Sequence, residues 1–225
     1  MKVSETRMDD RVIDEIVGLL ERELLKRDIP IVTRLAEERR DPFEILISTL
    51  LSLRTKDEVT AAATERLFAM ASTPEGMLRL SKGRIQKAIY PVGFYRNKAE
   101  TILHVCRELI RRFHSRVPES IEELLTLKGV GRKTANLVVS LGFNGAGICV
   151  DTHVHRISNR WGYVRTKTPE ETEFALRAKL PAEHWQRFNT LLVAFGRNIC
   201  RPISPLCSQC PVEAHCDRVG VTKSR

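Results

Sequence analysis

Apolar residues recur at helical spacing along almost the whole chain, and no segment alternates apolar and polar residues convincingly, as a half-buried strand would. Residues 8–27 place Ile13, Ile16 and Leu20 on one face, with charged residues on the opposite face. The same period returns over residues 95–114. The pattern therefore predicts an all-α fold and makes a sheet improbable.

Two segments carry the signature of a capped helix start. Asp41 precedes Pro42 and is followed at the third helical position by Glu44, and Thr168 opens a similar run that leads into a helix to about Lys179. A capping side chain accepts a hydrogen bond from a first-turn N–H group that has no partner in the helix. Further helices are predicted over residues 57–71, 82–90, 118–127, 132–142, 151–161 and 183–200, with a short one starting at residue 74.

The charge of the chain points to a polyanionic partner. Its 225 residues include 37 Lys and Arg against 28 Asp and Glu, a formal net charge of +9. Residues 128–165 carry six of these cations and only one carboxylate, Asp151. Nucleic acid is the commonest partner of a protein with such a basic segment. A hydrophobic content of 42% excludes global disorder.

Nothing in the sequence indicates a membrane segment. No apolar run approaches the about 18 residues that a spanning helix needs, because Ser48 and Thr49 interrupt the best candidate, residues 45–53. The first ten residues mix charges of both signs and lack the apolar core of a signal peptide. We therefore expect an intracellular protein that does not bind membranes, cytoplasmic and associated with the nucleoid if the source is prokaryotic. We also expect it to be a monomer.

Four of the six cysteines lie close together near the end of the chain. Cys200, Cys207, Cys210 and Cys216 are separated by six, two and five residues. Clustered cysteines in a reducing compartment indicate a metal site rather than disulfides, and four thiolates suit either zinc or a [4Fe–4S] cluster. Structural zinc sites usually use two closely spaced pairs, whereas this chain has one, so the spacing mildly favours iron–sulfur.

A glycine-containing turn is predicted between two helices. Gly129 and Gly131 bracket Val130, which is expected to pack inward as the anchor of the turn. The outward backbone N–H groups and the start of the next helix would form an anion site suited to a DNA phosphate. An ordinary helical hairpin with glycine caps is the alternative, but the adjacent Arg132 and Lys133 favour the anion site.

Several motifs together resemble one enzyme family. The run L-K-G-V-G-R-K-T-A-N begins at Leu127, V-D-T-H-V-H-R begins at Val150, and the four cysteines follow. With L-L-S-L-R-T-K-D from Leu50 and V-G-F-Y-R-N-K-A from Val92, the chain resembles endonuclease III over roughly residues 41–216. That family consists of DNA glycosylases with AP lyase activity in the helix-hairpin-helix superfamily.

The resemblance implies an architecture and a cofactor. It implies a six-helix barrel domain with the hairpin over residues 35–145, and a [4Fe–4S] domain made from residues 1–34 plus 146–225. DNA would bind in the cleft between these lobes. The cluster ligands would be the four clustered cysteines, and the role of the cluster would be mainly structural.

The resemblance also assigns the chemistry to two residues. Lys133 matches the nucleophile that attacks the sugar C1′ carbon and forms a Schiff base, and Asp151 matches the catalytic carboxylate. Taken alone, Lys133 would be interpreted as a phosphate-contacting or solvated lysine, and Asp151 as a helix N-cap. The resemblance overturns both interpretations.

Three further positions are implied to enter the duplex when the damaged base flips out. They are Arg54, Phe94 and His153, and the hairpin residues 129–132 would bind the backbone. Two features depart from the family pattern. Bacterial members commonly have Gln where this chain has Arg54, and the loop between Cys200 and Cys207, basic in relatives, has one cation here.

The predicted function is a bifunctional glycosylase and AP lyase of base excision repair that removes oxidised pyrimidines of the thymine glycol type from duplex DNA. The alternative within the superfamily is a monofunctional mismatch or adenine glycosylase, but those relatives lack a lysine at the position of Lys133. A non-catalytic helix-hairpin-helix DNA-binding module is the alternative from another class. It would make both Lys133 and Asp151 coincidental.

Overall fold

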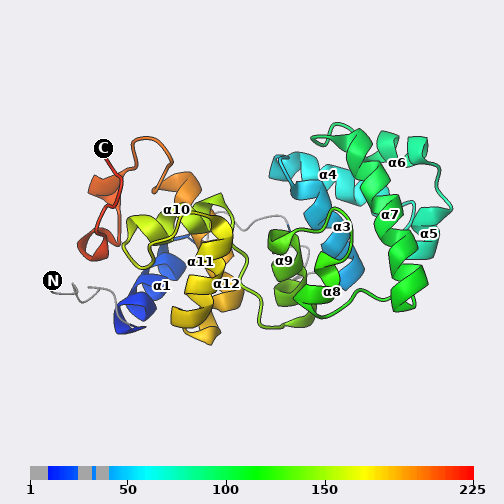
Figure 1. The fold of residues 1–225 in the computed structure, drawn as a ribbon. Coiled ribbons are helices and arrows are strands. Elements are labelled where there is room, and N and C mark those ends of the chain that lie inside the picture. The colour runs from blue at the N-terminus through cyan, green and yellow to red at the C-terminus, as the bar shows by residue number, and fades with distance from the viewer. Residues whose placement is uncertain (1–9, 25–31, 34–40) are drawn as a thin grey trace. The chain divides into compact units, whose positions relative to one another are not determined.

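The computed structural model describes residues 10–24, 32–33 and 41–225 of the chain (Figure 1). All regular elements within these residues are helices, which confirms the all-α prediction. None of the described helices is long and apolar enough to cross a membrane. The chain forms two compact units: Met1–Ile29 with Ile148–Arg225 is unit 1, and Pro30–Gly147 is unit 2.

Unit 2 contains the first long stretch of consecutive helices. They are α3 (Pro42–Ser52), α4 (Asp57–Phe68), α5 (Pro74–Leu78), α6 (Lys82–Ile89), α7 (Tyr95–Phe113), α8 (Ile121–Leu125) and α9 (Arg132–Phe143). The start of α3 is capped as predicted, because Asp41 Oδ1 accepts hydrogen bonds from the backbone N–H groups of Phe43, at 2.8 Å, and Glu44, at 3.0 Å.

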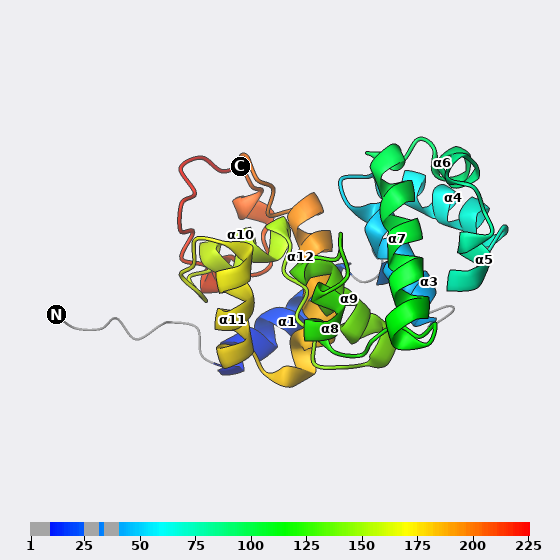
Figure 2. The same cartoon turned by 45° about the vertical axis from the view of Figure 1, so that its right-hand side comes forward.

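Helix α3 is the centre of unit 2. Its apolar side chains are buried on all sides, with Leu46, Ile47 and Leu51 fully inaccessible to solvent. It packs against α4, α7 and α9 (Figure 2). A helix that is apolar all round has to be surrounded by other elements, which explains why α4, α7 and α9 pack around it.

Unit 1 joins the two ends of the chain. It contains α1 (Asp10–Leu24), α10 (Thr152–Arg160), α11 (Pro169–Lys179) and α12 (Trp185–Asn198), followed by the cysteine-bearing tail. Helix α1 packs on α12, and α12 on α10 (Figure 1). The buried core brings Ile13 and Ile16 of α1 together with Trp161, Phe188 and Phe195.

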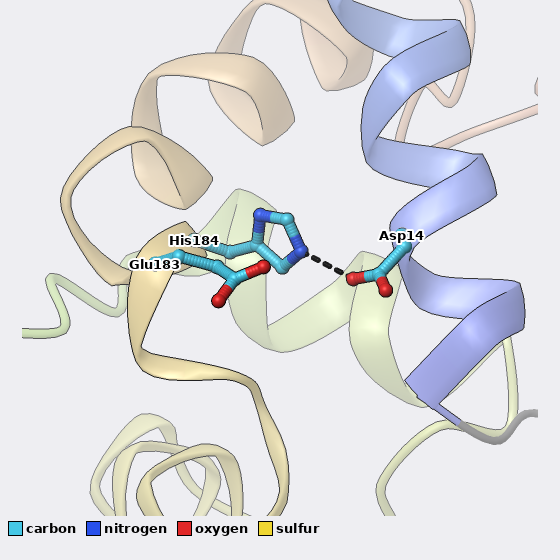
Figure 3. Close-up of side chains that lie close together, drawn as sticks. All are labelled: Asp14, Glu183 and His184. Atoms are coloured by element: carbon cyan, nitrogen blue, oxygen red, sulfur yellow. Dashed lines mark hydrogen bonds and ion pairs between the residues drawn. The ribbon is translucent and has the colours of Figure 1, made fainter.

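Polar contacts also attach α1 to the C-terminal half of unit 1. His184 Nε2 lies 2.6 Å from Asp14 Oδ1, and Glu183 lies beside this pair (Figure 3). Arg187, about one helical turn after His184, forms an ion pair with Glu21, which lies about two turns after Asp14. These contacts align α1 along α12, while the apolar core provides the main stabilisation.

Most predicted helices are confirmed within one to three residues. Helix α8 starts later than predicted, because Ser120 caps it by accepting a hydrogen bond from Glu123 N at 3.2 Å. The predicted helix over residues 183–200 begins as a 3₁₀ helix, η1 (Ala182–His184), before α12. The predicted ends of the first helix, residues 8–9 and 25–27, lie outside the described residues.

We predict that Ile16→Ala destabilises unit 1 by about 2–5 kcal/mol, because Ile16 is fully buried between α1 and the C-terminal helices. The measurement is the free energy of unfolding in a denaturant titration. Glu23→Ala, an exposed change on the same helix, serves as the control and should have little effect. An unchanged stability for Ile16→Ala would show that α1 contributes little to the core.

Candidate functional site

The predicted hairpin turn lies between α8 and α9. Gly129 has a φ of +94°, a conformation that strongly favours glycine, and Val130 is buried, as predicted. Val130 N donates to Leu127 O at 2.9 Å, which closes the turn. A Cβ atom on Gly129 would lie 2.5 Å from Thr101 Cγ2, so the turn is pressed against α7. Sterics within the protein therefore account for Gly129.

Gly131 requires a different explanation. It is the N-cap of α9, has a φ of −98°, and offers no side chain to accept a first-turn N–H group. A Cβ atom at this position would meet nothing within 4 Å. No contact within the described protein requires glycine here, whereas a side chain would obstruct a ligand approaching the start of α9. The start of a helix is electropositive, so the arrangement suits an anion.

A polar pocket lies beside this turn on the surface of unit 2. Lys128 contributes to it from the turn, and the remaining lining residues come from one face of α7; together they are Asn97, Glu100, Thr101, His104, Arg107 and Lys128. Glu100 forms an ion pair with Lys82 at 2.9 Å, and that hydrogen bond, reinforced by the charges of Lys82, Lys128 and Arg107, lowers the pKa of its carboxyl group. The cations outnumber the single carboxylate, which extends the positive surface of the turn.

Arg107 and His104 were not among the binding residues predicted from the sequence. They stand at helical spacing from Asn97 and Thr101, so a polar face of α7 was visible in the sequence. Its proximity to the turn was not visible, because it depends on how α7 packs against the residues around Gly129.

Lys133 is the second residue of α9, directly after the turn. It is half-buried, while the next residue, Thr134, is buried almost completely. The same short segment thus contains the predicted anion site and the predicted nucleophile. Because Lys133 belongs to the first turn of the helix, its position is tied to the backbone that would hold a phosphate.

Asp151 caps α10 in unit 1. Its Oδ1 atom accepts hydrogen bonds from His153 N at 2.8 Å and Val154 N at 3.0 Å. Within the described part of the chain, its second oxygen, Oδ2, accepts no hydrogen bond. The N-cap interpretation is therefore correct for one oxygen, and the other remains able to interact with a positive charge on a ligand.

The side chain of His153 lies against α12. A Cβ atom on Gly196 would come within 2.3 Å of His153 Nδ1, so glycine leaves room for the imidazole ring. Arg156 Nη2 lies 3.2 Å from the same nitrogen and also donates to Cys200 O at 2.9 Å. The orientation of His153 is thus coupled to the segment that carries the first clustered cysteine.

Arg160 forms hydrogen bonds to backbone carbonyl groups of the protein itself. It donates from Nη1 to Arg201 O at 2.7 Å and from Nη2 to Pro202 O at 2.6 Å. Arg156 and Arg160 belong to the basic segment that predicts a polyanion-binding face, but in the structure both fix the loop after Cys200. Fewer of the positive charges in that segment are therefore available to a ligand than the sequence indicates, because Arg156 and Arg160 bind carbonyl groups of the protein.

The structure brings the four predicted metal ligands together. Cys200, Cys207, Cys210 and Cys216 line one pocket with apolar residues that include Trp161. Two of the sulfur atoms accept hydrogen bonds from N–H groups: Arg160 Nη1 lies 3.5 Å from Cys200 Sγ, and Arg218 N lies 3.4 Å from Cys216 Sγ. Such donors stabilise thiolates, and hydrogen bonds to the sulfurs also tune iron–sulfur clusters.

Burial is the main cause that raises the pKa of the Cys210 thiol to about 12, and the charges of the three neighbouring thiols contribute to this rise. The pKa of Cys216 is raised for the same leading reason. Four buried thiolates would repel one another without a compensating cation. This chemistry fits a cationic metal centre that replaces the four protons.

Arg54 and Phe94 are neighbours in unit 2. Arg54 follows α3 and Phe94 precedes α7, and both have left-handed backbone conformations, with φ values of 53° and 57°. The Arg54 guanidinium lies 5.6 Å from the centre of the Phe94 ring. Phe94, the N-cap residue of α7, is 61% exposed, which is unusual for a large apolar side chain. The pair thus forms a projecting, partly apolar feature.

Comparisons with known proteins identify the family. The model of the HhH-GPD superfamily of base excision DNA repair proteins matches residues 47–182. Endonuclease III of Thermotoga maritima is 50% identical over 177 residues, which cover 79% of this chain and 83% of that protein. The chain belongs to the endonuclease III family. The hairpin, Lys133 and Asp151 lie within the matched segment, whereas the four cysteines lie beyond it.

Solved endonuclease III structures match almost the whole chain. A non-covalent endonuclease III–DNA complex has a TM-score of 0.82 and 34% identity, covering 94% of this chain and 96% of that one. A trapped covalent endonuclease III–DNA intermediate has a TM-score of 0.79 and 33% identity, covering 94% of this chain and 97% of that one. The resemblance to endonuclease III, first based on short motifs, is therefore confirmed across both units.

The two glycines of the hairpin make a matched test of the anion site. Gly129→Ala should lower the melting temperature, because a left-handed conformation and a close contact with Thr101 cost on the order of 1–3 kcal/mol. Gly131→Ala should lose less than about 1 kcal/mol of stability, because Ala is a poorer N-cap than Gly, but it should bind duplex DNA more weakly, since its methyl group lies in open space at the start of α9. Equal DNA affinity for Gly131→Ala and the unchanged protein would argue against a phosphate at this position.

Proposed function

We propose that the protein is a bifunctional DNA glycosylase and AP lyase that removes oxidised pyrimidines, such as thymine glycol, from duplex DNA. The observation that carries the proposal is the position of Lys133 in the first turn of α9, immediately after the Gly129–Gly131 turn. Membership of the endonuclease III family supports the same activity. A phosphate held by the turn would keep the adjacent sugar within reach of the amine.

Lys133 acts as the nucleophile in this proposal. Its neutral amine attacks C1′, the bond from C1′ to the damaged base breaks, and the base leaves with a proton. Opening of the sugar ring gives a Schiff base between Lys133 Nζ and C1′. The imine acidifies the C2′ proton, and loss of that proton expels the 3′ phosphate by β-elimination, which cleaves the strand.

Asp151 provides the negative charge that this reaction requires. The bond to the base breaks through a transition state with positive charge on the sugar, and a carboxylate stabilises such charge. The hydrogen bonds from His153 N and Val154 N occupy Oδ1 and fix the carboxylate in orientation. We assign Oδ2 to the interaction with the sugar or the lysine.

The DNA contacts follow from the exposed features of each unit. We assign the phosphate contact to residues 129–132, with Lys128 and Arg107 beside them. Arg54 and Phe94 would fill the space of the extruded nucleotide, and filling it reduces the stacking energy lost on base flipping. His153 is assigned to the DNA surface of unit 1. The low charge of the Cys200–Cys207 loop implies that it contributes little to DNA affinity.

We further propose that Cys200, Cys207, Cys210 and Cys216 hold a [4Fe–4S] cluster. Their convergence on one pocket, the N–H groups near their sulfurs and the raised pKa values fit a four-thiolate metal centre. When bound, the cluster would link the C-terminal tail to α10 and α12. Zinc would use the same ligands, so metal analysis distinguishes the two.

The two compact units would correspond to the predicted domains, residues 35–145 and residues 1–34 plus 146–225. The protein would act as a cytoplasmic monomer. A monofunctional adenine or mismatch glycosylase is disfavoured by Lys133, and a non-catalytic DNA-binding module is disfavoured by the endonuclease III family membership.

We predict that borohydride traps the unchanged protein covalently on duplex DNA with thymine glycol, and that Lys133→Gln abolishes the adduct. The reason is that reduction captures only a Schiff base, which needs the lysine amine. Lys87→Gln on α6 removes an exposed lysine of the same unit and should leave trapping unchanged. Base release without any trapped adduct would show a monofunctional glycosylase instead.

Asp151 can be tested apart from its capping role. Asn caps helices as well as Asp, so Asp151→Asn should keep the melting temperature while lowering the rate of base release by at least about 100-fold. Asp151→Ala should lose the rate and also destabilise the protein by about 1 kcal/mol. Asp41→Asn, the equivalent change at the N-cap of α3, is the control and should leave the rate unchanged. A normal rate for Asp151→Asn would reduce Asp151 to a structural cap.

The metal centre predicts a specific loss on substitution. Cys210→Ser should remove bound iron and acid-labile sulfide and lower the stability of unit 1, because the site then lacks one of four thiolates. Cys106→Ala, which changes a buried cysteine of unit 2, should retain the full metal content. Iron and zinc are measured by elemental analysis of the purified protein. Stoichiometric zinc with no iron would contradict the iron–sulfur assignment.

A further inference from the structure

Lys98 is a buried lysine that the proposed mechanism does not use. It lies on α7 and is only 9% exposed, yet its ammonium group has three acceptors. Nζ lies 2.8 Å from Leu51 O, 2.5 Å from Leu53 O and 3.2 Å from Thr55 Oγ1. An ammonium group has three N–H donors, so the three acceptors match its bonding capacity.

The acceptors of Lys98 belong to the end of α3 and the turn that follows it. The last carbonyl groups of a helix have no partner within the helix, and a cation there also interacts favourably with the helix dipole. Burial opposes the charge and lowers the pKa of Lys98 to about 8. Burial of a charged group costs free energy unless other groups pair with it, so the hydrogen bonds of the ammonium group explain why Lys98 can be buried here.

The same network reaches the turn before α7. Thr55 Oγ1, which accepts a hydrogen bond from Lys98, also lies 3.2 Å from Gly93 N, which donates to it. A Cβ atom on Gly93 would come within 2.5 Å of Arg54 O, so the two turns touch. Lys98 therefore connects the segment that presents Arg54 with the segment that presents Phe94.

The backbone conformations of Arg54 and Phe94 depend on contacts such as those of Lys98. Arg54 and Phe94 have left-handed backbone conformations, which non-glycine residues rarely adopt without surrounding contacts. Their side chains are exposed and lie against each other, with the guanidinium 5.6 Å from the ring centre. Exposed side chains can replace a flipped nucleotide efficiently only if they are held in position before the DNA arrives.

We propose that Lys98 is a positioning residue that holds the Arg54 and Phe94 turns together as a preformed wedge for the DNA duplex. The proposal rests on the DNA-inserting role assigned to these two side chains above. Lys98 itself touches no DNA. It acts through the carbonyl groups of Leu51 and Leu53 and through the Thr55 hydroxyl group.

The test uses a readout of insertion that does not depend on catalysis. A duplex contains an uncleavable tetrahydrofuran abasic analogue, and 2-aminopurine stands opposite it. Binding of the unchanged protein should raise the fluorescence as the wedge displaces the neighbouring stack, and Phe94→Ala should abolish the rise. Lys98→Met, which keeps the length of the side chain without its donors, should lower the rise about tenfold at saturating protein.

Cys106→Ala is the matched control for a general loss of stability. Cys106 is fully buried on the same helix, α7, but makes no contact with either turn among the described hydrogen bonds. It should keep the fluorescence rise even where its melting temperature falls as far as that of Lys98→Met. A similar loss in both variants would overturn the proposal, as would a full rise in Lys98→Met.

The proposed function and this inference fail in different ways. If the unchanged protein gives no fluorescence rise, there is no wedge and the positioning role of Lys98 is overturned, whatever the chemistry. If the rise is present but borohydride traps no adduct at an abasic site, the lyase assignment fails while the positioning role stands. A further check compares base release from thymine glycol paired with adenine and from thymine glycol opposite a one-nucleotide gap. Lys98→Met should strongly lower the rate of base release from the adenine-paired substrate, and should have little effect on the rate for the substrate with the gap.

Discussion

An α-helix leaves its first N–H groups and its last C=O groups without partners inside the helix. Several of the residues proposed to function in this protein lie at such helix ends. Asp151 satisfies N–H groups at the start of α10, and Lys98 satisfies carbonyl groups at the end of α3. At the start of α9 the N-cap is Gly131, which has no side chain. Side chains therefore satisfy backbone groups at two of these helix ends, and the third end suits an anionic ligand.

Helix α10 connects the two sites of unit 1. The capping carboxylate of Asp151 stands at its start, and Arg156 and Arg160 hold the cysteine-bearing loop further along. Backbone hydrogen bonds also hold this segment, such as those from Leu206 N to Ile199 O at 3.0 Å and from Val219 N to Arg160 O at 3.0 Å, and the proposed metal centre would add a further restraint. Removal of the metal is therefore expected to loosen the loop and the end of α10 together. Such a structural role for the proposed metal centre would not require electron transfer.

The sequence and the structure agree closely where the signal is local. The N-cap of α3 and the left-handed glycine of the hairpin follow from short-range chemistry at Asp41 and Gly129, and both were predictable. The prediction was less accurate where a distant contact decides. Arg156 and Arg160 contribute to a basic segment in the sequence, yet both bind carbonyl groups more than forty residues away. Lys98 belongs to the V-G-F-Y-R-N-K-A motif, but the sequence did not indicate its role, because its acceptors are equally remote.

The sequence by itself determined the helical class, the hairpin turn, the set of four cysteines and the resemblance to endonuclease III, because periodicity, caps and motif spacing are encoded in neighbouring residues. Only the tertiary structure decided which cations are available to a ligand, that the four thiols converge on one pocket, and that Lys98 joins the Arg54 and Phe94 turns. These features depend on side chains brought together from distant segments by burial of apolar surface, which no local pattern specifies.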